Sequence, residues 1–190
     1  VEELKAKFPN VTLNVLGGYY IRFEDPEVQR IVAENWGDGL GITHEQAAKV
    51  TSLNGKFAKN TIITTFNELQ YFTGLVNLGE YGGSFSGCTN LKSVRLPQEL
   101  SNLKTRDFYD CTALESINLE HIKEIGTYCF YNCILPISIN MPLLETAGDY
   151  AFWNTDITSI EDYGVIKAIG STFLYCDKLK TISRKFMNNI

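Results

Sequence analysis

Five cysteines and two histidines are the residues of this 190-residue chain that could carry nucleophilic or metal chemistry. A cysteine beside a histidine can act as the nucleophile of a hydrolase, and the two residue types together are common ligands of zinc. Cys129 and Cys133 flank Phe-Tyr-Asn, which is not the spacing of a zinc knuckle, and neither His44 nor His121 lies in a recognisable motif. The odd number of cysteines also argues against a complete disulfide framework. The sequence therefore predicts neither enzymatic activity nor a zinc site.

A glycine-rich turn between two expected helices is the candidate for a calcium site. Asn35-Trp-Gly-Asp38-Gly-Leu-Gly41 supplies a single carboxylate. A calcium loop of the EF-hand type needs oxygen ligands at positions 1, 3 and 5 and a bidentate glutamate at position 12. Gln46 would take the place of that glutamate, and an amide cannot coordinate in the same way. We therefore expect a tight turn between helices here, and no bound metal or other cofactor.

A phrase that recurs along the chain explains the cysteines more simply than catalysis does. Phe-x-x-Cys, or Phe-x-x-Thr in one case, begins at Phe85, Phe108, Phe130, Phe152 and Phe173. These phenylalanines are 23, 22, 22 and 21 residues apart. A cysteine whose place is fixed by a repeat is expected to be a small buried hydrophobic residue. We predict that the cysteines are buried and reduced.

Two further phrases keep the same period. Variants of Leu-x-x-Ile-x-Leu begin at residues 91, 114, 136, 157 and 179, and an Ile-Gly dipeptide or a relative begins at residues 78, 125, 147 and 169. The period lies in the range of 20–29 residues that is typical of leucine-rich repeats. Stacked coils would bury the apolar positions in a continuous core. The alternation within the first phrase predicts short strands, which would pair in parallel about 4.8 Å apart.

The three phrases together resemble the BspA-like (treponemal) class of leucine-rich repeat. The resemblance covers residues 75–190 and, more loosely, an entry segment at 61–74. Thr155 in place of cysteine, Asp162 in place of leucine and an insertion at 80–84 depart from the pattern. The resemblance implies a right-handed leucine-rich-repeat solenoid with a parallel sheet. It also implies a bacterial cell-surface or secreted protein that binds host or matrix proteins.

Residues 1–60 lack the repeat and show helix signals instead. A short helix is expected over 1–8 and a strand over 11–15. Asp25 followed by Pro26 is a strong helix start, because aspartate caps the first N–H groups and proline suits the first helical position. We expect this helical region to cap the first coil, since an open coil end exposes apolar side chains and strand edges.

A second helix is predicted after Thr43. The residues Thr43-His-Glu-Gln46 read as a capping box, and the helix is expected to run to Val50. The chain is thus predicted to be an α/β protein of two parts. These are a helical N-terminal capping region at 1–60 and a leucine-rich-repeat solenoid at 61–190.

Composition and charge exclude two classes of partner. The formal net charge of −5 disfavours nucleic acid, whose binding needs a basic surface. No apolar stretch approaches the roughly 20 residues of a membrane span. The chain begins at Val1 without a signal peptide, which leaves open a cytosolic protein or a trimmed mature one. The resemblance favours the surface or secreted location.

Two sets of outward residues are candidate binding surfaces for an extracellular protein or a glycan. The sheet-face set follows the core-facing residue of each strand and comprises Arg95, Asn118, Asn140 and Glu161. The aromatic set follows the core phenylalanine in three coils and comprises Tyr109, Tyr131 and Trp153. The predicted function is non-enzymatic binding or adhesion to protein partners across the repeat surface. The alternative is an accessory protein that binds carbohydrate through the aromatic set.

Overall fold

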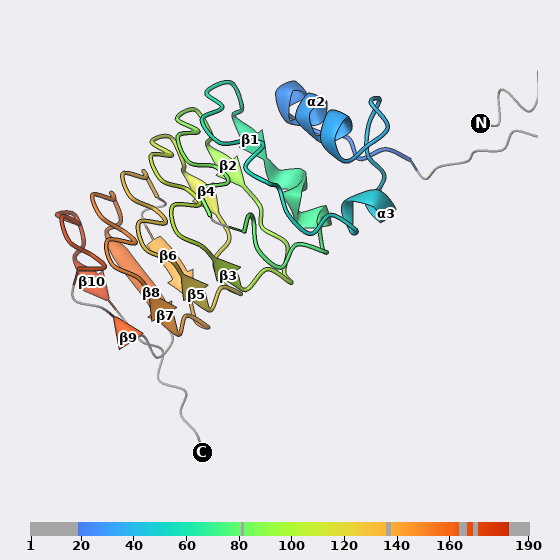
Figure 1. Ribbon diagram of the computed structural model, residues 1–190. Coiled ribbons are helices and arrows are strands. Elements are labelled where there is room, and N and C mark those ends of the chain that lie inside the picture. The colour runs from blue at the N-terminus through green and yellow to red at the C-terminus, as the bar shows by residue number, and fades with distance from the viewer. Residues whose placement is uncertain (1–18, 81, 136–137, 164–166, 169–170, 183–190) are drawn as a thin grey trace, which may run out of the picture.

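A computed structural model describes residues 19–80, 82–135, 138–163, 167–168 and 171–182 of the chain. Short strands stack along an elongated solenoid, and two helices lie at its N-terminal end (Figure 1). The architecture is mostly strand with a small helical N-terminal part, which confirms the predicted repeat solenoid. The helix expected over 1–8 and the strand expected over 11–15 lie outside the described residues.

The strands form two rows along the solenoid (Figure 1). The first row consists of β1 (Thr65–Phe66), β2 (Ser93–Val94), β4 (Ser116–Ile117), β6 (Ser138–Met141), β8 (Ser159–Tyr163) and β10 (Thr181–Ile182). The second row consists of β3 (Asn102–Leu103), β5 (Glu124–Ile125), β7 (Thr146–Ala147) and β9 (Lys167–Ala168). The first row is split into the sheets β1-β2-β4 and β6-β8-β10, and the second row is one sheet.

All pairings among these strands are parallel and join equivalent positions of neighbouring coils. Ser93 of β2, for example, pairs with Thr65 of β1 and with Ser116 of β4. Val94, the next residue, is buried, whereas Arg95 is exposed. The alternation in the Leu-x-x-Ile-x-Leu phrase therefore turns one side chain in two toward the core, as predicted.

A column of phenylalanine rings forms the centre of the solenoid. Neighbouring ring centroids lie 5.2 to 5.5 Å apart along the series Phe57, Phe85, Phe108, Phe130, Phe152 and Phe173. The continuous core expected from stacked coils is thus confirmed, and its phenylalanine column begins one coil earlier than the repeat phrase indicated. Phe57 lies close to the expected boundary at residue 60, and the division into 1–60 and 61–190 remains a proposal.

Helix α2 (Pro26–Asn35) begins where the sequence predicted and covers the first coil. One carboxylate oxygen of Asp25 accepts the N–H groups of Glu27 at 2.9 Å and Val28 at 3.1 Å. The other oxygen accepts the N–H of Thr64 at 2.7 Å and its hydroxyl at 2.9 Å. The same side chain therefore caps the helix and attaches it to the chain that enters β1.

Helix α3 (His44–Ala47) has the predicted capping box but ends earlier than expected. The N–H groups of Lys49 and Val50 bond to carbonyl oxygens only three residues back, so the α-helical pattern stops. The backbone of Gly74 packs closely here, because a Cβ atom on it would lie 2.3 Å from the carbonyl oxygen of Ala48. Close packing against this segment accounts for the short helix. A 3-10 helix, η1 (Asn67–Tyr71), follows β1.

Candidate functional site

The cysteines, which could carry nucleophilic or metal chemistry, lie in the core of the solenoid. The five cysteines are free and buried, and no group of three or more His, Cys, Asp or Glu side chains within the described ranges is placed to hold a metal. Asp38, in the turn considered for calcium, accepts the N–H groups of Leu40 and Gly41 through Oδ1. Its Oδ2 accepts the hydroxyl of Tyr20. The carboxylate of Asp38 is thus engaged in holding the turn.

The sheet-face set is only partly available for binding. Arg95 and Asn140 are exposed, whereas Asn118 is half-buried. The Asn118 amide accepts the N–H of Leu96 at 2.7 Å and donates to the Leu96 carbonyl oxygen at 3.0 Å. Asn118 therefore braces the neighbouring coil. Glu161 lies on β8 and pairs in register with Asn140.

The aromatic set forms a stacked column on the turns of the coils. The Tyr109 and Tyr131 rings are 4.8 Å apart with an angle of 5° between their planes. Tyr131 and Trp153 are 5.8 Å apart with an angle of 19°. All three side chains are half-buried. The parallel stacking follows from the repeat, because equivalent turn positions lie above one another in successive coils.

A second column lies beside the first. Tyr128 and Tyr150 stack at 5.1 Å, and each meets a ring of the first column edge to face, Tyr128 with Tyr131 at 5.8 Å and Tyr150 with Trp153 at 5.1 Å. Tyr175 extends the group to the next coil, 4.4 Å from Trp153. We call these six rings the aromatic ridge: Tyr109, Tyr128, Tyr131, Tyr150, Trp153 and Tyr175.

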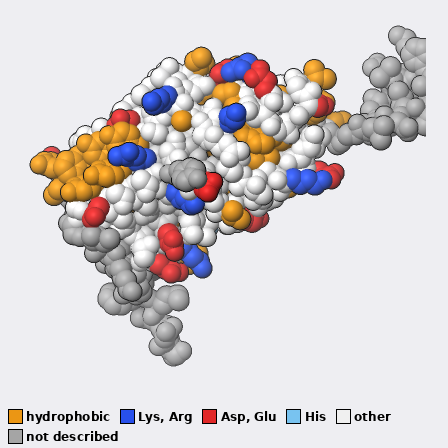
Figure 2. Space-filling view, viewed as in Figure 1, with side chains coloured by type: hydrophobic (Ala, Val, Ile, Leu, Met, Phe, Trp, Pro, Cys, Tyr) orange, Lys and Arg blue, Asp and Glu red, His pale blue; other side chains and the backbone are white. Residues whose placement is uncertain are grey.

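The guanidinium of Arg106 closes the N-terminal end of the ridge. It lies 5.6 Å from the centre of the Tyr109 ring and 5.5 Å from that of Tyr128. Figure 2 shows apolar and aromatic side chains gathered in one continuous area toward the C-terminal end of the solenoid, with a basic side chain beside it. Exposed hydrophobic areas of this kind mark interaction sites in soluble proteins.

Three ridge residues have a backbone conformation that bulky side chains avoid. Tyr128, Tyr150 and Tyr175 have φ angles of 57°, 57° and 59°. Gly83, with φ of 73°, takes the place of Tyr128 and Tyr150 in an earlier coil, two residues before the core phenylalanine. Such conformations cost on the order of 1–3 kcal/mol for residues other than glycine. The equivalent residues Arg106, Asp110, Asn132 and Asn154 also have positive φ, so the conformation belongs to the repeated turn, and the tyrosines adopt it together with their neighbours.

Sequence reasoning missed half of the ridge. It identified the position after each core phenylalanine, but not the position two residues before it, where Tyr128 and Tyr150 stand. The signal was present, because both tyrosines follow an Ile-Gly or Ala-Gly phrase at the same distance. Tyr175 had a weaker signal, since it occupies a position that carries Asn132 and Asn154 in the preceding coils.

The Tyr109 hydroxyl remains protonated, and so a hydrogen-bond donor, at neutral pH. Burial and the neighbouring carboxylate of Asp110 raise the pKa of Tyr109 above its ordinary value. The faces of the inner rings are covered by their neighbours in each column, so the ridge offers ring edges and hydroxyl groups to a partner.

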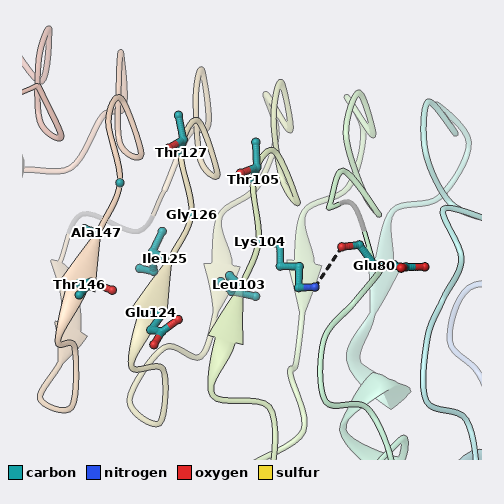
Figure 3. Close-up of a pocket in the computed structure, with 11 residues that line it drawn as sticks. Glu80, Leu103, Lys104, Thr105, Glu124, Ile125, Gly126, Thr127, Thr146 and Ala147 are labelled. Carbon is teal, nitrogen blue, oxygen red and sulfur yellow. Dashed lines mark hydrogen bonds between the residues drawn. The ribbon is translucent and has the colours of Figure 1, made fainter.

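A groove of about 720 Å³ with a mixed polar and apolar lining adjoins the ridge (Figure 3). Its lining includes Thr105 and Thr127, which directly precede Arg106 and Tyr128 in the chain. The Lys104 ammonium donates to the backbone carbonyl oxygen of Glu80 at 3.0 Å across one end of the groove.

Glycine in the repeated Ile-Gly phrase lets the coils approach at this groove. A Cβ atom on Gly126 would lie 2.5 Å from the backbone nitrogen of Thr105, and one on Gly148 would lie 2.6 Å from that of Thr127. Both contacts are shorter than any real Cβ contact, so neither position tolerates a side chain without a shift of the neighbouring coil. The glycine of the Ile-Gly phrase therefore allows neighbouring coils to stack closely.

Comparison with known proteins agrees with this geometry. The BspA type leucine rich repeat region matches in six copies over residues 57–180 of the 190. The chain belongs to the BspA-type leucine-rich-repeat family. The first matched copy begins at Phe57, the residue that opens the phenylalanine column of this BspA-type solenoid.

Solved structures similar to this BspA-type chain are bacterial leucine-rich-repeat proteins. The Treponema pallidum protein is 16% identical, with a TM-score of 0.55 over 72% of this chain and 64% of its own. The Bacteroides ovatus protein is 25% identical, with a TM-score of 0.47 over 57% of this chain and 29% of its own. A leucine rich cell surface protein of Faecalibacterium prausnitzii is 17% identical, with a TM-score of 0.44 over 71% and 43% of the two chains.

The BspA-type chain thus spans less than two thirds of each of these proteins, and the likeness to the Treponema structure concerns the fold alone. No curated protein matches the chain. Within the part that the structure describes, no helix is long and apolar enough to cross a membrane.

Proposed function

We propose that this protein is a non-enzymatic binding protein that presents the aromatic ridge to an extracellular protein partner. The ridge carries the proposal, because six interlocked rings and a guanidinium form one continuous, partly exposed surface. Tyrosine, tryptophan and arginine are the residues most enriched where protein interfaces bind tightly. The repeat fold supports an interaction role, and we place the protein at the bacterial surface or in secretion.

The stacking favours a protein over a glycan as the partner. A sugar ring binds best against the open face of an aromatic ring. Both faces of Tyr131 are covered, one by Tyr109 and the other by Trp153. Ring edges and phenol hydroxyls instead suit the carbonyl groups and aromatic side chains of a protein surface.

Substitution of the aromatic column tests the proposal. The variant Tyr109→Ser, Tyr131→Ser, Trp153→Ser keeps the fold, because Ser86 stands at the same turn position in an earlier coil. Binding to a panel of purified extracellular-matrix proteins and to a glycan array is compared with that of the parent. We expect the parent to bind a protein of the panel, and the variant to lose about 2 kcal/mol or more of binding free energy.

The matched control is the sheet-face variant Arg95→Ser, Asn140→Ser, Glu161→Ser. Asn118 is left unchanged because its amide holds the backbone of Leu96. Loss of protein binding from this control alone would move the site to the sheet face. Binding of glycans alone, with loss in the aromatic variant, would establish the carbohydrate alternative.

A further inference from the structure

A second pocket lies where the N-terminal cap meets the first coil, away from the turns that bear the ridge. Its volume is about 470 Å³, and it is lined by residues 21–24, by His44 at the start of α3, and by residues of η1. The side chains that decide its chemistry are Glu24, His44, Glu68 and Tyr71. The cap and the solenoid build this pocket jointly.

Glu68 is the unusual residue of this pocket. Its side chain is 6% exposed, which is rare for a glutamate without a charged partner. Its Oε1 accepts the N–H of Glu24 at 3.0 Å. Its Oε2 is buried and has no hydrogen-bond partner among the described residues. A buried carboxylate oxygen left unpaired is costly, so its presence points to a donor that is supplied from outside the chain.

The surroundings of Glu68 supply a second carboxylate, aromatic edges and one cationic side chain, Arg22. The carboxylate of Glu24 accepts the Asn67 amide at 3.3 Å. None of the four ion pairs formed by the described residues includes Glu24 or Glu68. The His44 and Tyr71 rings meet edge to face at 4.7 Å. The pocket therefore combines two carboxylates, neither of them in an ion pair with a described residue, with aromatic walls.

We propose that this pocket binds the basic side chain of a polypeptide, with its guanidinium or ammonium group at Glu68. The N–H groups of such a side chain supply the missing donor, and charge-assisted hydrogen bonds of this type are among the strongest in proteins. A metal ion fits less well, because the described residues offer no cluster of three acidic or histidine ligands.

The neighbouring groove favours a cation that is part of a polypeptide over a free amine. A groove of about 860 Å³ runs over β2 and β4 and shares Glu24, Asn67 and Gln70 with the pocket. It is lined by polar groups, including Arg95 and Glu120. An extended segment in this groove places one basic side chain in the pocket. The proposal is independent of the aromatic ridge.

Binding of small capped peptides to the whole chain tests the proposal. The probe is acetyl-Gly-Arg-Gly-amide, and its matched control contains citrulline, which is uncharged and has the shape of arginine. Titration followed by NMR is expected to give saturable shifts at residues 21–24 and 67–71 with the arginine peptide. The citrulline peptide should bind at least roughly tenfold more weakly, the effect of losing one charge-assisted hydrogen bond. Spermidine, as a free amine, should bind more weakly than the peptide.

Two variants test whether peptide binding depends on the Glu68 carboxylate itself or on the overall negative charge of the protein. Glu68→Gln keeps an Oε1 acceptor for the Glu24 N–H, so the fold is retained, which circular dichroism checks. It should weaken the arginine peptide at least roughly tenfold. Glu145→Gln changes an exposed glutamate outside both the pocket and the groove, and its affinity should stay within about twofold of the parent.

Should Glu68→Gln be unfolded, Tyr71→Ala takes its place as the test, with the same expected loss. Equal binding of arginine and citrulline peptides, or equal loss in Glu68→Gln and Glu145→Gln, overturns the proposal. Tighter binding of spermidine than of the peptide overturns the assignment to a polypeptide. The ridge variant should bind the arginine peptide as the parent does.

Discussion

The thiol of Cys133 donates a hydrogen bond to the backbone carbonyl oxygen of Phe108, one coil earlier, across 2.9 Å. Equivalent bonds of 2.9 to 3.1 Å join Cys88 to Phe57, Cys111 to Phe85 and Cys176 to Phe152. Each of these four cysteines, which we call the ladder cysteines, therefore links its coil to the one before it. Thr155 breaks the ladder, because its hydroxyl bonds to Phe152 of its own coil at 3.0 Å.

The ladder predicts how the cysteines react. Burial raises the pKa of Cys88, Cys129, Cys133 and Cys176, so little of the reactive thiolate forms near neutral pH. Titration with a thiol reagent should find almost no reactive cysteine in the native protein and five after denaturation. Two or more disulfide bonds found by mass spectrometry would contradict this prediction.

Substitution in the phenylalanine column should cost far more than substitution in the ridge. Phe130→Ala removes a fully buried ring between two others and should lower the free energy of unfolding by about 3–5 kcal/mol. Tyr150→Gly loses ring contacts but relieves a positive φ, so its net effect should stay within about 1 kcal/mol. Urea unfolding of both variants measures the difference. Similar losses for the two would mean that the ridge is part of the core.

Asp107 should make the stability depend on pH. Its wholly buried carboxylate accepts the N–H groups of Lys104 at 2.7 Å and Ser84 at 3.3 Å. Burial raises the pKa of Asp107 from 3.8 to about 6, although these hydrogen bonds oppose the rise. The folded protein thus binds a proton between about pH 4 and pH 6 that the unfolded chain does not bind, and it gains stability as the pH falls through this window.

The variant Asp107→Asn isolates this effect. His121, whose pKa is lowered by burial, acts with the opposite sign, but parent and variant share it. On going from pH 7 to pH 4, the parent should gain about 1–3 kcal/mol relative to Asp107→Asn. Urea unfolding at several pH values measures the gain. If the free energies of unfolding of the two proteins changed with pH in parallel, the prediction would be wrong.

Calcium should leave the stability unchanged. Both carboxylate oxygens of Asp38 are occupied by the turn and by Tyr20, and a ligand that is specific to the folded state must raise the melting temperature. Thermal unfolding with and without millimolar calcium is the measurement, and magnesium serves as the control. A rise of several degrees with calcium alone would show that the turn opens to bind it.

The sequence predicted the solenoid well because each repeat position has one physical task. Phe108 and Phe130 stack, and Gly126 allows the neighbouring coil to approach. Core residues alternate with outward ones in the strands. Each of these requirements recurs in every coil, so it selects the same residue type at a regular spacing in the sequence. The candidate surfaces were harder to predict. Nothing in its residue type shows that Asn118 bonds to the backbone of Leu96, since its partner lies one coil away. Glu68 was missed because its burial depends on how the cap packs on the first coil.

The carboxylate of Asp25 connects two segments that lie far apart in the chain, the start of α2 and the entry to β1. Because one carboxylate serves both Val28 and Thr64, the first turn of α2 and the entry to β1 are ordered together or not at all. The N-terminal region should thus open as a cooperative unit with the first coil, and the amide protons of Val28 and Thr64 should exchange with solvent through the same opening. A fragment that is cut between Val28 and Thr64 would lose the ordered start of α2 and the ordered entry to β1 together.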